Sequence, residues 1–192
     1  MSLKIGFAMC GSFCTHAQAL DALKNLTKDF PDIIPIVSEI SASTDTRFGS
    51  ADHLLQEMEL VTGNAVLTSI SDVEPIGPHK ALDALVITPA TGNTIAKLAA
   101  GITDTSVTMA AKAVLRSGRP VILGISTNDG LSANAKNIGE LLNRKNYYFV
   151  PFGQCDVENR PCSLVSDFEK LTETLQNALE GKQIQPILSV KP

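Results

Sequence analysis

The stretch from residue 82 to residue 109 constrains the fold of this chain most strongly, and it reads LDALVITPATGNTIAKLAAGITDTSVTM. Residues 84–88 form a short apolar run rich in β-branched side chains, which predicts a strand buried on both faces. Pro89 is expected to end this strand, because proline has no N–H to donate to a sheet. From Thr94 the apolar residues recur at helical spacing, and Gly101 is expected to end that helix. The stretch therefore predicts a strand, a tight turn and a helix.

The turn consists of small and polar residues, with Thr91, Asn93 and Thr94 after Pro89. A strand that enters a helix through such a turn leaves free backbone N–H groups at the start of the helix, and these bind anions such as phosphate. Helix capping without any ligand requires the same residue types. The turn alone leaves both interpretations open.

The composition is that of a globular protein, with 44% hydrophobic and 19% charged residues over 192 positions. A chain of this length predicts one domain over residues 1–192, in which the tail after residue 181 has too little pattern to assign. The net charge of −4 and the absence of a run of Lys or Arg argue against a nucleic-acid partner. No apolar stretch approaches the roughly 20 residues that span a bilayer, so we expect no membrane contact.

The cysteines are Cys10, Cys14, Cys155 and Cys162, and their spacings fit no zinc site. We therefore expect no metal and interpret all four as thiols. The N-terminus leads directly into a strand pattern and shows no signal peptide. Both observations predict a cytoplasmic protein.

The beginning of the chain has the order of a Rossmann-like domain. Residues 4–9 are strand-like, a turn with Gly11 and Ser12 follows, and apolar residues at helical spacing come next. The complete G-x-G-x-x-G fingerprint is absent, which favours a mononucleotide over a dinucleotide. A tight turn that merely requires glycine is the alternative. Ser38 follows a second predicted strand at residues 33–37, at the end where ligands of parallel sheets gather.

Further strands are predicted at residues 65–70, 121–125 and 147–150, the last of these being the final strand. Ser126, Thr127 and Asn128 follow the strand at 121–125, and a polar loop at residues 41–50 contains Arg47. The predicted fold is a single Rossmann-like three-layer α/β domain with a parallel sheet of about six strands and helices on both faces.

The turn at residues 89–94 resembles the proline-alanine-serine-alanine-asparagine-threonine motif of flavin-dependent cysteine decarboxylases. These enzymes belong to a flavoprotein superfamily that also includes flavin prenyltransferases. Within that superfamily, the chain most resembles the family of dipicolinate synthase B subunits. The motifs that carry this resemblance are VEPIGP at 73–78, PATGNT at 89–94, TDTSVTMAAKA at 103–113, GISTNDGL at 124–131 and YFVPFGQ at 148–154.

The resemblance implies that the chain binds FMN. The implied FMN-binding residues are Gly11, Ser12, Ser38, Pro89, Thr91, Asn93, Thr94, Ser126 and Thr127. Asn128 matches an asparagine that binds substrate in the decarboxylases, and Arg47 could bind a substrate carboxylate as a bidentate fork. We take these two as candidate catalytic residues. The alternatives are that Asn128 only caps the following helix and that Arg47 is solvated.

The family also implies a reaction and partners. The reaction is the oxidation of a dihydro- or hydroxytetrahydro-dipicolinate, a small dicarboxylate, to the dipicolinate of bacterial spores. The implied partner is the dehydrogenase-like A subunit of dipicolinate synthase, with NADP bound through that partner. The flavoproteins of this superfamily further imply a homo-oligomer based on trimers.

Two other classes of function remain open on the sequence. One is a flavin-dependent decarboxylase or prenyltransferase that acts alone. Against the decarboxylase, Pro75 stands about where phosphopantothenoylcysteine decarboxylases have a catalytic histidine, and Ser126 and Thr127 replace the residues before the motif asparagine. The other class is a non-catalytic subunit that keeps the fold and supports its partner.

Overall fold

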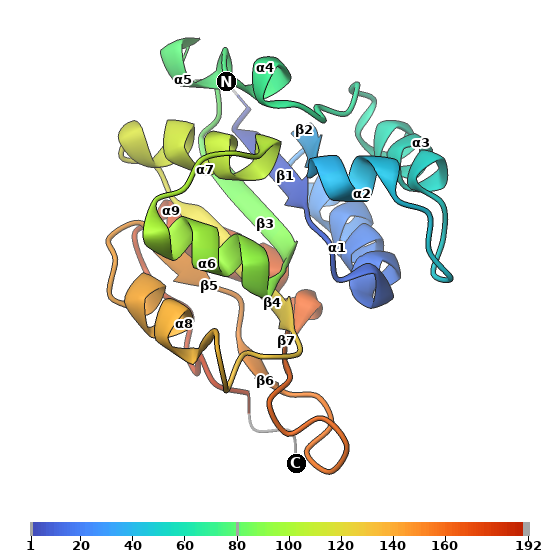
Figure 1. Ribbon diagram of the computed structural model, residues 1–192. Helices are drawn as coiled ribbons and strands as arrows, with labels where there is room; N and C mark the ends of the chain where they lie inside the picture. Colours follow the sequence, from blue (N-terminus) through green and yellow to red (C-terminus); the bar gives the residue numbers. More distant parts are fainter. Residues whose placement is uncertain (1, 80, 190–192) are drawn as a thin grey trace.

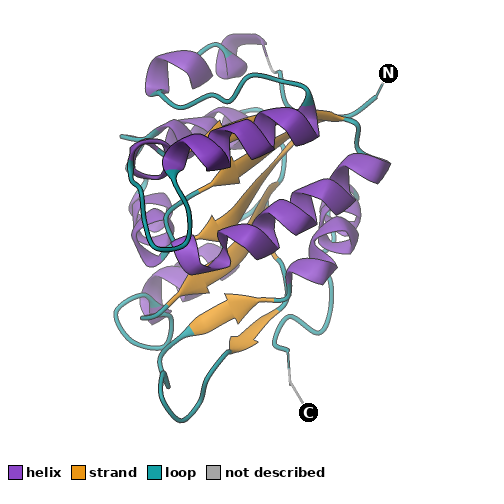
Figure 2. Cartoon of the chain, turned by 90° about the vertical axis from the view of Figure 1, so that its right-hand side faces the viewer, coloured by secondary structure: helices purple, strands orange, loops and turns teal. Residues whose placement is uncertain are grey.

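The computed structural model describes residues 2–79 and 81–189. Within these residues a seven-stranded, mostly parallel sheet has the strand order β2-β1-β3-β4-β7-β6, and β5 pairs with the first half of β4. Helices cover both faces of the sheet (Figure 1), and the view turned by 90° shows the strands between the helical layers (Figure 2). The predicted three-layer α/β fold is confirmed.

The strands are β1 (Lys4–Met9), β2 (Asp32–Val37), β3 (Ala84–Ala90), β4 (Val121–Thr127), β5 (Tyr147–Phe149), β6 (Phe152–Gln154) and β7 (Leu164–Ser166). The helices are α1 (His16–Asp29), α2 (Glu39–Ser43), α3 (Ala51–Thr62), α4 (Ile70–Val73), α5 (Ile76–His79), α6 (Gly92–Ala100), α7 (Ser106–Arg116), α8 (Ala135–Leu142) and α9 (Leu171–Leu179). Two short 3-10 turns, η1 (Phe13–Thr15) and η2 (Phe168–Lys170), precede α1 and α9.

Alternate side chains of each central strand enter two different hydrophobic cores. Ile5, Phe7 and Met9 of β1 belong to the core that α1, α3 and α9 cover. Ala8, between them in sequence, belongs to the core that α6, α7 and α8 cover. Successive side chains of a strand point to opposite faces, and both faces are buried here, so the strands appear in the sequence as continuous apolar runs.

The order of the strands determines where a ligand can bind. From β1 the chain crosses to β2 on one side, and then passes to β3 on the other side of β1. Such a reversal opens a crevice at the carboxyl ends of the strands, which is the usual ligand position in open parallel sheets. Helices α1 and α6 begin at this edge (Figure 1).

Helix α6 begins two residues earlier than predicted, because Thr91 is its cap. The Thr91 hydroxyl oxygen accepts the N–H of Thr94 at 3.2 Å. At the other end of the helix, Gly101 adopts a φ of 71°, as its predicted role as a helix stop requires. The first turn of α6 therefore lies directly at the end of β3.

Pro89 lies inside β3, so the prediction that it ends the strand is wrong. The pairing of β3 with β4 shifts register between Ile87 and Ala90. A ladder that is irregular at this point needs no N–H from the proline, which explains why the strand continues. The Pro89 carbonyl oxygen still accepts the N–H of Cys10 from β1 at 3.3 Å.

Residues 65–70 do not form the predicted strand. In this part of the chain a single bridge joins Leu67 to Ile36, and α4 begins at Ile70. The predicted polar loop at residues 41–50 begins inside α2. Both segments are short and mixed in character, and the packing of neighbouring elements decides their structure.

The strand at Tyr147–Phe149 is not the final strand of the sheet. An antiparallel pair, β6 and β7, follows it, and β7 pairs with the second half of β4 through Ser126 and Thr127. Strands of three residues are too short to be identified by an alternating pattern. Beyond α9, the N–H of Ser189 donates to the carbonyl oxygen of Phe152, so the tail lies beside β6. Among the described residues, no helix has the length and apolar character needed to cross a lipid bilayer.

Candidate functional site

A cleft of about 640 Å³ lies at the carboxyl ends of the central strands. Six of the residues that the sequence predicts for the site line it: Ser12, Thr91, Asn93, Ser126, Thr127 and Asn128. They come from the turns after β1 and β3 and from the end of β4, three segments that are far apart in the sequence. The strand order brings them together, as the crevice at the reversal of the sheet requires.

The turn after β1 is fastened to the end of β4. Ser12 has a φ of 62°, in the left-handed region, and its hydroxyl donates to the carbonyl oxygen of Ser126 at 2.5 Å. The hydroxyl of Thr15, on η1, lies 2.9 Å from the Ser12 carbonyl oxygen and 3.1 Å from the Ser126 hydroxyl oxygen. These contacts hold the start of α1 against one wall of the cleft.

The start of α6 forms the opposite wall. Its first N–H groups, those of Gly92 and Asn93, have no partner within the helix, and the Asn93 side chain is exposed. Thr94 points inward instead, where its hydroxyl lies 3.1 Å from that of Thr91 and interacts with the Cys10 thiol. Burial of Cys10 raises the pKa of its thiol to about 12, so this sulfur remains protonated.

A carboxylate approaches the first turn of α6. Asp129 accepts hydrogen bonds from the Thr127 hydroxyl (2.5 Å) and from the Asn134 side-chain amide (2.7 Å). A Cβ atom on Gly92 would lie only 2.6 Å from Asp129 Oδ1, so glycine is required for this close approach. A negative charge at a helix start is favourable, and the protein itself supplies part of it here.

The loop between β6 and β7 closes the cleft on its third side. Arg160 is the one cation among the described lining residues, and its Nε lies 3.5 Å from Asp156 Oδ2. The loop is held by a hydrogen bond from the Leu131 N–H to the Cys162 carbonyl oxygen at 3.0 Å and by another from Gln154 Nε2 to the Pro161 carbonyl oxygen at 2.8 Å. Cys155, on the same loop, and Cys14, on η1, also line the cleft, and both are exposed free thiols.

Sequence reasoning missed Arg160, Cys155 and Cys14 as members of the site. Arg160 and Cys155 reach the cleft because β7 returns antiparallel beside β4. The only sequence signal for this loop was its polar character, and polarity alone does not predict that a loop lies beside the cleft.

Five residues predicted for the site do not line the cleft: Gly11, Ser38, Arg47, Pro89 and Thr94. Ser38 is 6% exposed, and its hydroxyl donates to that of Ser41 at 3.0 Å. Arg47 is exposed on the loop after α2, and its guanidinium lies 4.8 Å from the ring centroid of the adjacent Phe48. Arg47 is therefore outside the cleft in this conformation of the loop.

The donors of the cleft fit a phosphate-bearing organic cofactor. Hydroxyl, amide and backbone N–H groups line it, Arg160 and Asp129 add one charge of each sign, and its volume is within the range of small-molecule sites. Across the described part of the chain, no group of three or more His, Cys, Asp or Glu side chains could hold a metal ion.

Comparison with known proteins gives consistent matches. A model of the flavoprotein family matches residues 1–179. The B subunit of dipicolinate synthase from Bacillus subtilis (strain 168) is 43% identical over 185 residues, which are 96% of this chain and 92% of that protein. The crystal structure of the dipicolinate synthase B subunit from Bacillus halodurans has a TM-score of 0.90 and 41% identity over 100% of both chains. Burkholderia xenovorans DmrB in complex with FMN, a cubic protein cage for redox transfer, matches with a TM-score of 0.67 and 18% identity over 93% of this chain and 96% of that chain. The resemblance inferred from the sequence motifs is confirmed.

Proposed function

The chain belongs to the flavoprotein family, and on that premise we propose that it is the FMN-binding subunit of a dipicolinate synthase. The proposed reaction oxidises a dihydro- or hydroxytetrahydro-dipicolinate to dipicolinate in spore formation. The dihydro compound loses two electrons and two protons, and the hydroxytetrahydro compound also loses one water. One observation carries the proposal: motif residues from three distant segments line a single cleft in a chain that is 43% identical to a B subunit of this enzyme.

Ser12, Thr91, Asn93, Ser126 and Thr127 would hold the flavin. Because Asp129 already places negative charge at α6, we expect the phosphate to lie nearer the turn at residues 12–15 than the start of α6. Bound FMN would accept the two electrons that the substrate loses. Ser38 and Thr94 are buried and hydrogen-bonded. They would stabilise the turns after β2 and β3 without contacting the flavin.

Asn128 and Arg160 would bind the substrate. The two carboxylates of the substrate need a cation or amide donors, and these two exposed side chains stand on different walls of the same cleft. Arg160 takes the role that the sequence suggested for Arg47. Arg47 would reach the cleft only if its loop closed over the site.

Partner and assembly follow from the same proposal. The A subunit of the synthase, a dehydrogenase-like protein, would accompany this chain, with NADP bound through that partner. The chain itself would form a homo-oligomer based on trimers.

A supporting role without catalysis is the second candidate function. The described lining of the cleft contains no histidine or lysine, so a general base with an ordinary neutral-range pKa is absent from that lining. In this alternative the chain would hold its partner in position and would not bind flavin tightly.

The visible absorption of the purified chain, followed by a product assay with the A subunit, tests the proposal. We expect flavin bands and dipicolinate formation that requires this chain. Asn128→Ala should keep its flavin and lose tenfold or more in turnover, which corresponds to about 1.4 kcal/mol. A colourless protein that cannot be reconstituted with FMN, yet still supports its partner, would favour the supporting role.

Arg160→Lys and Arg160→Ala separate substrate binding from catalysis. Both should raise KM more than they lower kcat, with the larger effect for alanine, because lysine keeps the charge but loses the bidentate fork. Arg47→Ala is the matched control and should leave both constants unchanged while its loop stays open. An unchanged KM in Arg160→Ala would remove this arginine from the substrate site.

A further inference from the structure

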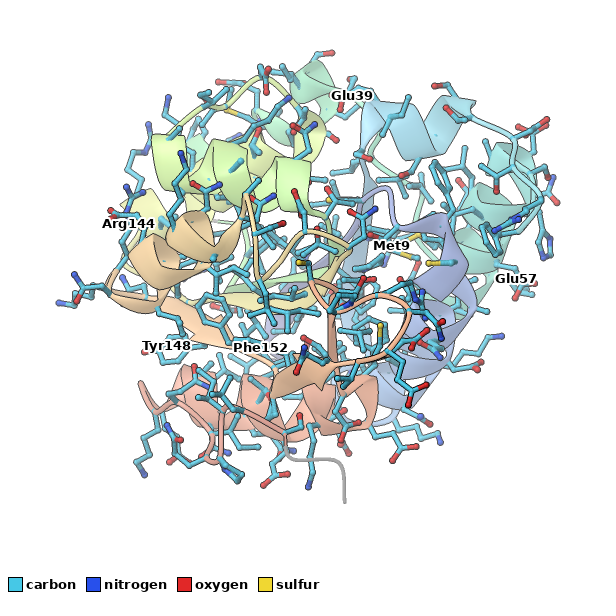
Figure 3. The ribbon with its side chains drawn as sticks, turned by 60° about the horizontal axis from the view of Figure 1, so that its bottom comes forward. Met9, Glu39, Glu57, Arg144, Tyr148 and Phe152 are labelled. Carbon is cyan, nitrogen blue, oxygen red and sulfur yellow. The ribbon has the colours of Figure 1, made fainter. Side chains whose placement is uncertain are left out.

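A second cavity lies between the end of α6, one side of α7 and the turn that joins α8 to β5. Helices α6, α7 and α8 lie on the left side of Figure 1. Its volume is about 590 Å³, and it shares no lining residue with the cofactor cleft. Figure 3 shows Arg144, which lines this cavity, at the outer edge of the molecule and well apart from Met9 at the end of β1. We call this cavity the basic groove.

The floor of the basic groove is apolar. Leu98 is buried. Leu115 and Tyr147 are half-buried, and these two side chains still present surface to a ligand. Ile102, at the rim, is 46% exposed. Covering apolar surface of this kind with a second molecule is favourable, because the surface is removed from water.

Four cations surround this floor: Lys112, Arg116, Arg144 and Lys145. No Asp or Glu is among the described lining residues. Arg144 is held in place, since it donates to the carbonyl oxygens of Leu98 (3.1 Å) and Ala99 (2.6 Å) and pairs with Glu140 (3.0 Å). It thereby neutralises the negative end of α6, which would otherwise repel an anion.

The remaining three cations have no ion-pair partner among the described residues. Lys112, Arg116 and Lys145 are exposed, and none makes an ion pair or side-chain hydrogen bond with the described residues. Lys112 and Arg116 are one turn apart on α7, where like charges repel each other and destabilise the helix. In a chain with a net charge of −4, this is an uncompensated positive region beside an apolar floor.

We propose that the basic groove is the docking site for an acidic segment of a partner protein. Carboxylates of that segment would face Lys112, Arg116 and Lys145, and one large apolar side chain would cover Leu115 and Tyr147. An apolar centre within a charged rim is the usual anatomy of a protein interface, and tyrosine and arginine are the residues most often decisive in one. This inference rests on the proposed function in naming the partner, which is the A subunit of dipicolinate synthase.

The position of the groove suits such a partner. Because the groove and the cleft have no residue in common, the A subunit can be bound while the cleft remains open to substrate. Opposite charges on the two surfaces would raise the association rate and fix the orientation of the complex.

The test is the affinity of the purified, flavin-containing chain for the purified A subunit, measured with titration calorimetry. The double variant Lys112→Glu/Arg116→Glu should raise Kd tenfold or more, whereas Lys112→Arg/Arg116→Lys should change it little. Lys145→Glu provides a second charge reversal. Because Lys145 lies on a turn outside α7, this substitution cannot act by unfolding that helix. Lys136→Glu is the matched control, because Lys136 is an exposed helical lysine outside the groove. Added salt should weaken the wild-type complex more than the double variant.

Three results would overturn the inference. One is equal affinity of the wild type and of all charge-reversal variants for the A subunit. Another is failure of the wild-type chain to bind the A subunit. The third is a change of homo-oligomer mass in the double variant with unchanged affinity for the partner, which would make the groove a contact between copies. Flavin content is measured on the same samples: its absence from the wild type contradicts the proposed function, whereas lost affinity with full flavin content concerns docking alone.

Discussion

At the scale of single residues, Ser12 is a lining residue of the cleft with a strained backbone. A non-glycine residue in the left-handed region costs about 1–2 kcal/mol, and its φ is 62°. Its hydrogen bond to the Ser126 carbonyl oxygen offsets part of this, since such a bond contributes about 0.5–1.5 kcal/mol. The hydrogen bond of the hydroxyl therefore explains the serine at this position, because the backbone conformation alone would favour glycine.

Two substitutions of Ser12 separate these effects. Ser12→Gly and Ser12→Ala should both lower the flavin retained after gel filtration, because both lose the hydroxyl. Ser12→Ala should also be less stable than Ser12→Gly by about 1 kcal/mol in urea unfolding, because alanine keeps the backbone strain. Full flavin content in both variants would contradict a role for the hydroxyl in binding.

The four cysteines differ in their environments. Cys10 is 1% exposed, and burial raises its pKa to about 12, whereas Cys14 and Cys155 are exposed in the cleft. The folded pKa of Cys10 lies above its ordinary value of 9.0, so the stabilisation that comes from keeping it neutral is complete below pH 9 and is lost as the pH rises toward 12.

Alkylation with iodoacetamide should follow these differences. At pH 8 and at pH 9, Cys14 and Cys155 should react, and Cys10 should react only after unfolding, because only thiolates attack. Added FMN should slow the reactions of Cys14 and Cys155 and leave that of Cys162 unchanged, since Cys162 does not line the cleft. Peptide mass spectrometry measures each site, and equal rates with and without FMN would argue against flavin in this cleft.

At the scale of elements, polar contacts fix the positions of helix starts near the ends of the central strands. Glu39 Oε1, at the start of α2, accepts the N–H of Ser106 at the start of α7 at 2.7 Å (Glu39 is labelled in Figure 3). The Thr127, Asp129 and Asn134 side chains form a similar junction against the first turn of α6. The second junction packs against Gly92, so the position of the α6 wall of the cleft depends on it.

Gly92→Ala tests the second junction. The new Cβ would collide with Asn134 Nδ2 and lie 2.7 Å from Thr127 Oγ1, so the loop must move. We expect a loss of stability of about 1–3 kcal/mol, together with weaker flavin binding. Gly139→Ala is the control: it is also in a helix, has no neighbour within 4 Å of its Cβ, and should gain about 0.5–1 kcal/mol. Urea unfolding of both variants measures the difference, and equal stability would show that the loop adapts without cost.

At the scale of the whole molecule, one sheet separates two apolar cores, and both proposed functional surfaces border the core that α6, α7 and α8 cover. The cleft is at the carboxyl edge of the sheet, and the basic groove lies along α7 beside the end of α6. Two separate surfaces on a chain of 192 residues are consistent with a protein that works within an assembly.

Light scattering with in-line size exclusion tests the expected homo-oligomer. The mass of the wild type should be a multiple of three chains of 20.4 kDa. Because the partner is expected to dock at the basic groove, the variant Lys112→Glu/Arg116→Glu should keep this mass. A wild-type mass of one chain at micromolar concentration would contradict the trimer-based assembly.

Local sequence pattern predicts the layered fold and six of the residues that line the cleft. Runs of apolar residues identified β1, β3 and β4, because a strand buried on both faces needs apolar side chains at every position. The polar residues directly after these strands, such as Ser12, Thr91 and Asn128, could then be assigned to one edge, since parallel strands share their carboxyl side. These inferences need only local pattern and the rules of parallel sheets.

The remaining features of the site depend on contacts that form only in the folded chain. Arg160 reaches the cleft because the three-residue strand β7 returns beside β4. Arg47 lies outside the cleft, with its guanidinium over the ring of Phe48. Pro89 remains in β3 because the register with β4 shifts beside it, and Ser38 and Thr94 turn inward to neighbouring hydroxyls. Each outcome depends on a contact between residues distant in sequence or on the packing around a short segment, and neither leaves a periodic pattern in the chain.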